Sequence, residues 1–157
     1  MSENIHRSIA VYEELKGVLN SLEWKYEEHE EDLTIAFSGR GDDLPMKIVA
    51  TVDKDIELLN IRSRMPCKIP EEKRIEAALM ICATNKQFMQ GTFDFDAGSG
   101  DIYYYISNTF IGGTLSKEAI EYMVAATTFI IDKYNDKFFM FAKGMMSFEQ
   151  YFEWLAK

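Results

Sequence analysis

Histidine, cysteine and proline are scarce in this sequence of 157 residues, which has two, two and three of them. His6 lies beside an apolar position near the start of a predicted helix, and His29 lies in a charged turn. We interpret both as solvated surface side chains and not as general bases. Cys67 and Cys82 lie in different predicted elements without a second metal ligand at a useful spacing. We therefore expect reduced, buried, structural thiols, with no metal site and no cofactor.

Complete phosphate-binding and calcium-binding motifs are also missing. The pair Gly112 and Gly113 and the stretch "SGRG" match no phosphate-binding spacing, so they predict turns. Asp94 and Asp96 have the first spacing of an EF-hand loop, but Tyr105 stands where a bidentate glutamate is required. A plain hairpin loop is therefore predicted. Most carboxylates lie in runs such as "EEHEED", which are typical of a solvated face. These absences argue against an enzyme.

Positive charge is the minority charge, because 17 Lys and Arg stand against 26 Asp and Glu, a net charge of −9. Nucleic-acid affinity depends on Lys and Arg releasing counterions from phosphates, so nucleic acid is excluded as a partner. No run approaches the ~20 apolar residues of a membrane helix, and acidic residues come too early for a signal peptide. We expect a cytoplasmic protein that binds no membrane.

Apolar and aromatic residues are plentiful, at 47% and 13% of the chain. This composition is typical of a folded globular protein, and the length suits one domain that spans residues 1–157. Hydrophobic periods of three to four and of two predict an α+β fold, with helices flanking an antiparallel sheet of about five or six strands. The predicted order is α-β-β-β-β-α-β-β-α-α: a helix over 5–22, two hairpins within 24–65, a helix over 70–85, a hairpin within 91–110, a long helix and a short last helix.

The two last helices have clear boundary signals. Ser116 is a good N-cap for the long helix, which continues to Lys143, and Gly144 can end it in a left-handed conformation. Ser147 and Gln150 form a capping-box pair in front of the short helix at about 147–156.

Tyrosines alternate along the strand that follows the loop "DAGSGD". Ile102, Tyr104 and Ile106 share one face, which suits the core. Tyr103 and Tyr105 share the other face, which we expect to be half wet, because a phenol ring packs well there and keeps its hydroxyl hydrogen-bonded.

The long helix is apolar on two sides. Tyr122, Phe129 and Met140 lie roughly opposite its main apolar stripe. Either the last helix folds back and covers this second surface with Phe148 and its apolar neighbours, or a protein partner covers it. The candidate partner-binding residues are Tyr103, Tyr105, Tyr122, Phe129, Met140 and Trp154.

One further pattern lies in the second half of the chain: Asn85, Gly91 with Phe93, the "GDIY" that begins at Gly100, and the Leu115-Ser116 entry to the long helix. With this pattern, over about residues 70–140, the chain resembles the YbjN family of bacterial sensory transduction regulators. The resemblance is structural in character. It implies a fold similar to type III secretion chaperones, small acidic proteins that commonly dimerise and bind segments of other proteins without catalysis. An extra strand and the added C-terminal helix distinguish this chain from those chaperones.

The sequence therefore favours a non-enzymatic protein-protein interaction module, chaperone-like or regulatory, that forms a homodimer and binds a further protein. The alternative is a small-molecule-binding protein or an enzyme whose pocket lies between the sheet and the long helix.

Overall fold

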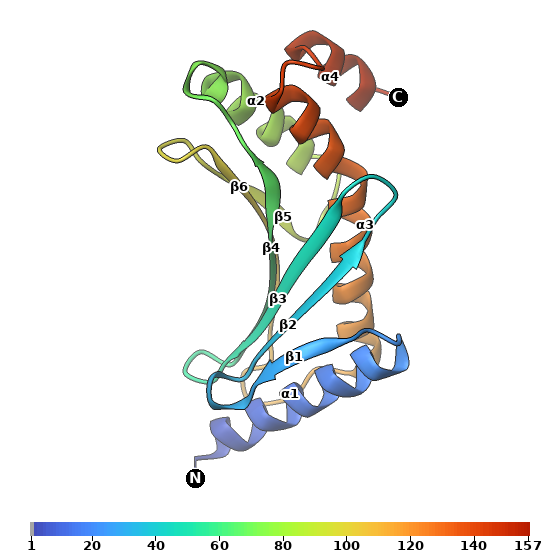
Figure 1. The fold of residues 1–157 in the computed structure, drawn as a ribbon. Coiled ribbons are helices and arrows are strands. Elements are labelled where there is room, and N and C mark those ends of the chain that lie inside the picture. The colour runs from blue at the N-terminus through green and yellow to red at the C-terminus, as the bar shows by residue number, and fades with distance from the viewer. Residues whose placement is uncertain (1) are drawn as a thin grey trace.

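The computed structural model describes residues 2–157, and this part of the chain forms four α-helices and six β-strands (Figure 1). Short 3-10 helices, η1 and η2, precede β2 and α2. The predicted α+β class and element order are confirmed. In chain order the elements are α1 (Glu3–Ser21), β1 (Tyr26–His29), η1 (Glu30–Asp32), β2 (Thr34–Arg40), β3 (Pro45–Asp53), β4 (Leu58–Lys68), η2 (Glu71–Lys73), α2 (Arg74–Asn85), β5 (Thr92–Asp96), β6 (Asp101–Thr109), α3 (Lys117–Ala142) and α4 (Phe148–Leu155).

The six strands form one antiparallel sheet of order β1-β2-β3-β4-β6-β5. Helices α1 and α3 pack on one face of it, and α3 lies along β3, β4 and β6. Helices α2 and α4 gather at the far end of the molecule, away from α1 (Figure 1). On the other face, side chains such as Lys47, Arg62 and Ser107 are exposed, so this face of the sheet is open.

The buried side of α1 is rotated from the predicted stripe. Tyr12, Leu15 and Leu19 are buried as expected, but Ile9 and Leu22 are exposed. Leu22 follows the last helical residue as the C-cap, where the helical period no longer places side chains. The buried residues of α1 are Ser8, Val11, Tyr12, Leu15, Val18 and Leu19.

Strand β4 continues beyond residue 65, where the second predicted hairpin ends. Pro66 lies inside β4, which ends at Lys68. The β3–β4 ladder stops at the pair Ile48↔Ser63, and the β4–β6 register shifts between Arg64 and Lys68. The missing N–H of Pro66 therefore removes no bond from the β3–β4 ladder.

The signals that bound the last two helices work as predicted. The Ser116 hydroxyl accepts a hydrogen bond from the Ala119 backbone N–H at 3.1 Å, and Gly144 has a φ of +74° just beyond α3. At α4, Ser147 and Gln150 exchange hydrogen bonds of 2.8 and 3.1 Å, which completes the capping box.

Helix α4 is held by an aromatic cluster that centres on Phe93. The ring centroid of Phe93 lies 5.4 Å from that of Tyr104, 5.6 Å from Tyr134 and 5.1 Å from Phe138. Tyr151 of α4 stacks on Phe138 at 6.0 Å. The last helix therefore docks on α2 and on the C-terminal part of α3.

Candidate interaction surfaces

The tyrosines of β6 divide between two faces as the alternation predicts. Ile102, Tyr104 and Ile106 are buried. Tyr103 and Tyr105 are half-buried on the open face, with stacked rings whose centroids lie 6.1 Å apart. Burial raises the pKa of Tyr104 to about 12, so its hydroxyl stays protonated.

Two of the predicted contact residues on α3 project outward. Tyr122 is 56% exposed and Phe129 is 68% exposed. They are two helical turns apart and therefore lie on one side of the helix. The buried stripe on the other side is as expected and contains Ile120, Met123, Val124, Thr127, Ile131, Tyr134, Phe138 and Phe141.

Met140 and Trp154 are less available than predicted, because both are half-buried. The Trp154 ring packs edge-on against Tyr134, with 5.5 Å between centroids. Helix α4 thus packs its aromatic side against the C-terminal part of α3. Of the two alternatives for the second surface of the long helix, coverage by the last helix is wrong for Tyr122 and Phe129, since both remain exposed.

Helix α2 has an exposed apolar stripe that the sequence analysis missed. Ile75 is 81% exposed and Leu79 is 55% exposed, and Ala78 and Cys82 continue the same stripe. The expectation that both thiols are buried is therefore wrong for Cys82, while Cys67 is half-buried. The available signal was that this helix is apolar all round, a pattern that requires burial on two sides. The opposite side packs inward through Ala77, Met80, Ile81 and Thr84.

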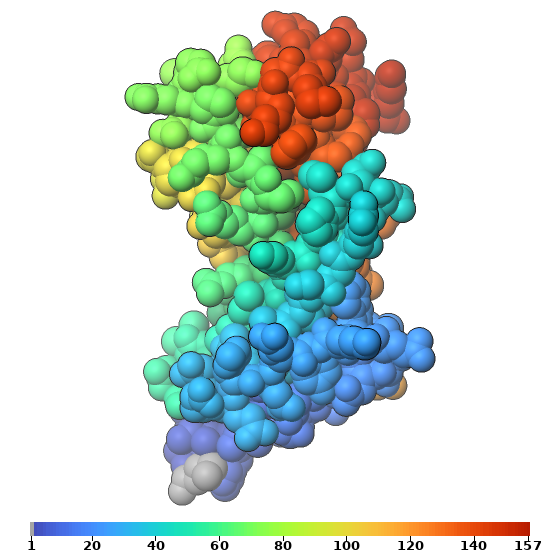
Figure 2. Space-filling view, in the orientation of Figure 1, coloured from blue at the N-terminus to red at the C-terminus, as the bar shows by residue number. Residues whose placement is uncertain are grey.

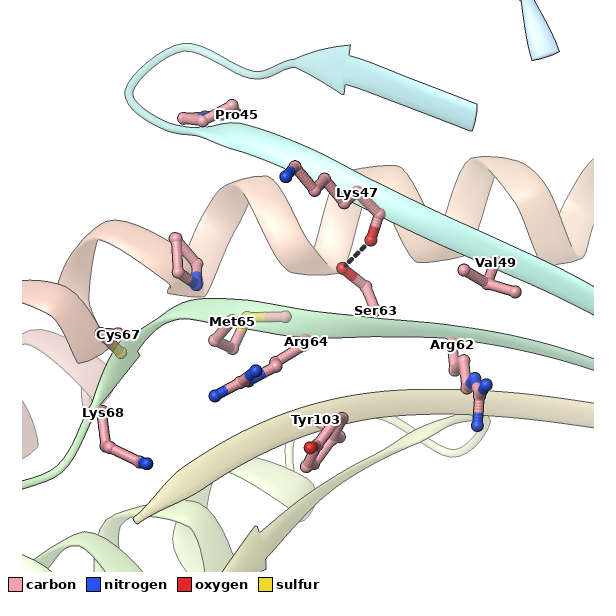
Figure 3. A pocket seen from close by; sticks show the side chains of 11 residues that line it. Pro45, Lys47, Val49, Arg62, Ser63, Arg64, Met65, Cys67, Lys68 and Tyr103 are labelled. Atoms are coloured by element: carbon pink, nitrogen blue, oxygen red, sulfur yellow. Dashed lines mark hydrogen bonds between the residues drawn. The ribbon is translucent and has the colours of Figure 1, made fainter. Parts of the chain in front are cut away.

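A hollow of about 760 Å³ opens where β3 and β4 diverge. Its lining comes from the start of β3, the second half of β4 and one residue of β6 (Figure 3). Among the described residues, none of those that line the hollow is acidic. The lining residues are Pro45, Lys47, Val49, Arg62, Ser63, Arg64, Met65, Pro66, Cys67, Lys68 and Tyr103.

The charges around this hollow are only partly paired. Arg64 donates a hydrogen bond of 2.6 Å to the carboxylate of Asp101, which lowers the pKa of that carboxyl group. Within residues 2–157, Lys47, Arg62 and Lys68 have no carboxylate within ion-pair distance. The hollow is therefore a cationic site with an aromatic wall.

The space between the sheet and α3, where the alternative hypothesis placed a pocket, is packed with side chains. Ile61 and Ile106 from the sheet and Val124 from α3 are each 3% exposed or less. Among residues 2–157, no three His, Cys, Asp or Glu side chains gather in a way that could hold a metal ion. None of the helices in the described chain is long and apolar enough to cross a membrane.

Comparisons with known proteins agree with this fold. The family model "YbjN: Putative bacterial sensory transduction regulator" matches residues 12–140. A chain of the ExsC-ExsE complex has a TM-score of 0.60 at 14% identity, covering 82% of this chain and 93% of that one. YbjN from E. coli has a TM-score of 0.55 at 12% identity, covering 80% and 92%. No curated protein matches the chain in a sequence comparison.

Proposed function

Since the chain belongs to the YbjN family, we propose that it is a non-enzymatic regulatory or chaperone-like protein that acts in the cytoplasm by binding other proteins. The observation that carries the proposal is the exposure of large apolar side chains on the outward sides of two helices. These are Ile75 and Leu79 on α2, and Tyr122 and Phe129 on α3. Such patches supply the binding energy of protein interfaces. The likeness to a chain of the ExsC-ExsE complex supports the same role.

The chemistry of the hollow supports a role without catalysis. Its one sulfur nucleophile is the thiol of Cys67, and burial raises the pKa of this thiol to about 11. A thiol with that pKa is almost entirely protonated near neutral pH and is a poor nucleophile. His6 and His29 are exposed and do not line the hollow, so neither can act there as a base.

A second copy of the chain is the partner that the α2 stripe fits best. In a two-fold symmetric dimer the same patch meets itself, so one apolar helix side can be buried by its own copy. Ile75 and Leu79 are one turn apart and would interlock with the same residues of the second helix at an axial distance of about 8–10 Å. This leaves Tyr122 and Phe129 for a further protein.

Light scattering coupled to size-exclusion chromatography tests self-association. We expect a dimer for the unmodified chain and a monomer for Leu79→Glu, because the carboxylate would have to be buried in the interface. Ile56→Glu is the matched control, since Ile56 is also more than half exposed but lies in the β3–β4 turn. A strict monomer at high concentration contradicts the dimer.

A pull-down from the source cell tests the second surface. Changing Tyr122 and Phe129 to Ser should remove one specific protein while circular dichroism stays unchanged. Ile111→Ser is the control, because Ile111 is an exposed apolar residue outside α3. Unchanged recovery with the α3 variant would mean that this surface binds no partner.

A further inference from the structure

Positive charge gathers around the hollow in a chain whose net charge is negative. Lys47, Arg62, Arg64 and Lys68 surround it (Figure 3), and Asp101 forms an ion pair with Arg64 and attracts its cross-strand neighbour Lys68 at longer range. Like charges on neighbouring strands of one face repel each other, which destabilises the sheet. This repulsion is only partly offset within the chain. A local arrangement that works against folding in this way is typical of a functional site.

The strands beside the hollow leave main-chain groups available. The β3–β4 ladder ends at Ile48↔Ser63, and β4 continues to Lys68 without a β3 partner. The Ser63 hydroxyl donates a hydrogen bond of 2.7 Å to the Lys47 carbonyl at the end of that ladder. Beyond it the two strands diverge (Figure 1). An extended chain can bind to such a strand edge through its own backbone.

The cations repeat with the period of a strand. Arg62 and Arg64 are alternate residues of β4, so their side chains start about 6.6 Å apart, which is two rises of ~3.3 Å. Tyr103 is the cross-strand neighbour of Arg64, and Tyr105 is the neighbour of Arg62. Tyr103 lines the hollow and Tyr105 continues the aromatic surface beside it, so a half-buried ring lies next to each arginine.

We propose that this hollow binds an extended acidic segment of a partner protein, with carboxylates at alternate residues facing Arg62 and Arg64. The inference rests on the proposed protein-binding function and assigns it a second, charge-specific site. A single phosphate group is too small to reach cations that are spread over β3 and β4. Nucleic acid is disfavoured because its phosphates extend far beyond the four cations of the hollow and are repelled by the net charge of −9, whereas a short acidic segment carries only a few charges.

Binding is measured by fluorescence anisotropy with the full chain and a labelled peptide in which glutamate alternates with threonine. The matched peptide has glutamine in place of glutamate. We expect the glutamate peptide to bind, the glutamine peptide not to bind, and the affinity to fall as salt is added. Arg62→Glu should weaken binding by about tenfold or more, which corresponds to ~1.4 kcal/mol.

Two further variants keep the test decisive. Lys54→Glu makes the same charge change at an exposed residue of the β3–β4 turn, and it should alter affinity by less than about twofold at physiological salt. Arg62→Gln should weaken binding in the same direction as Arg62→Glu but less, because it removes the cation without adding repulsion. If Arg62→Glu fails to fold, the affinity of Arg62→Gln for the glutamate peptide alone decides the test.

Four results would overturn the proposal. They are equal binding of the glutamine peptide, equal losses in Arg62→Glu and Lys54→Glu, tighter binding of inorganic triphosphate than of the peptide, and a change of oligomeric state in Arg62→Glu with peptide binding unchanged. The last two would identify a small phosphate ligand and a contact between copies. None of them affects the pull-down through Tyr122 and Phe129, so failure here is distinguishable from failure of the proposed function.

Discussion

The hydroxyl oxygen of Tyr151 in α4 lies 2.5 Å from that of Thr84 in α2, and both residues are fully buried. Thr84 donates its own proton to the Met80 carbonyl at 2.7 Å, so Tyr151 is the donor between the two hydroxyls. Burial raises the pKa of Tyr151 and keeps that proton in place. One side-chain hydrogen bond thus joins the C-terminal helix to a helix 67 residues earlier in the chain.

Removal of the Tyr151 hydroxyl and removal of the Thr84 hydroxyl should lower the free energy of unfolding by unequal amounts. Tyr151→Phe removes the donor but leaves Thr84 bonded to Met80, so we expect a loss of about 1 kcal/mol in the free energy of unfolding. Thr84→Val leaves the Tyr151 hydroxyl buried without an acceptor and should lose about 2–3 kcal/mol. Urea denaturation measures both, and the double variant should lose less than the sum. Equal losses would contradict the assigned direction of donation.

Substitution by alanine should change the free energy of unfolding in opposite directions at two glycines. Gly91 has a φ of +78°, and a Cβ there would lie 2.2 Å from the Tyr104 hydroxyl, so Gly91→Ala should destabilise the fold by about 1–3 kcal/mol. Gly17 lies inside α1 with nothing within 4 Å of its Cβ position, so Gly17→Ala should stabilise the fold by about 1 kcal/mol. Thermal unfolding followed by circular dichroism compares them.

The two thiols should react at very different rates. Cys82 is exposed, whereas Cys67 is half-buried with a pKa raised to about 11 by desolvation. At a pH near 8, and at a protein concentration low enough to dissociate the proposed α2 dimer, an aromatic disulfide reagent should therefore modify Cys82 quickly and Cys67 slowly. Cys82→Ser should abolish the fast phase, and Cys67→Ser should leave it unchanged. A fast phase that survives Cys82→Ser would contradict the structure.

Acid should weaken the contact between α1 and the β3–β4 turn. Arg7 donates a hydrogen bond of 2.5 Å to Glu57, and this bond is the main cause of the lowered pKa of the Glu57 carboxyl. The stability from this contact is full above the unfolded pKa of 4.5 and is lost as the pH falls through the lower folded value. Arg7→Met should therefore lose less stability than the unmodified chain between about pH 6 and about pH 3.

The control for this measurement is Lys117→Met, which removes an exposed helical pair with Glu121 at 3.7 Å. Exposed pairs of this kind contribute little. The acid dependence of Lys117→Met should match that of the unmodified chain, and a match by Arg7→Met as well would exclude the Glu57 contact as a source of acid sensitivity.

Local signals predicted the ends of the helices well. Ser116, Gly144 and the Ser147–Gln150 pair act within one or two turns of their own position, so their role depends little on the rest of the fold. The buried stripe of α3 was also predictable, because seven apolar positions and Thr127 repeat with one period. Where the period was ambiguous the prediction failed. In α2 both sides are apolar, and the sequence does not indicate which side faces the core.

A candidate surface could be predicted from the sequence only where all of its residues belong to one helix or strand. Tyr122 and Phe129 belong to one helix, and helical spacing alone places them opposite the buried stripe. The cationic hollow depends on the divergence of β3 and β4. Lys47 and Arg62 look like ordinary surface residues in the sequence, because nothing local indicates that their strands stop pairing beside Ser63.

The waist in the middle of the molecule (Figure 2) lies between two groups of helices, α1 at one end and α2 with α4 at the other (Figure 1). Helix α3 contacts both α1 and α4 and packs along the sheet between them. If one end opens, the amides of the nearby turns of α3 can exchange with deuterium while the other end stays closed. The amides of its central turns exchange only when both groups separate from the sheet, so their protection should equal the global free energy of unfolding.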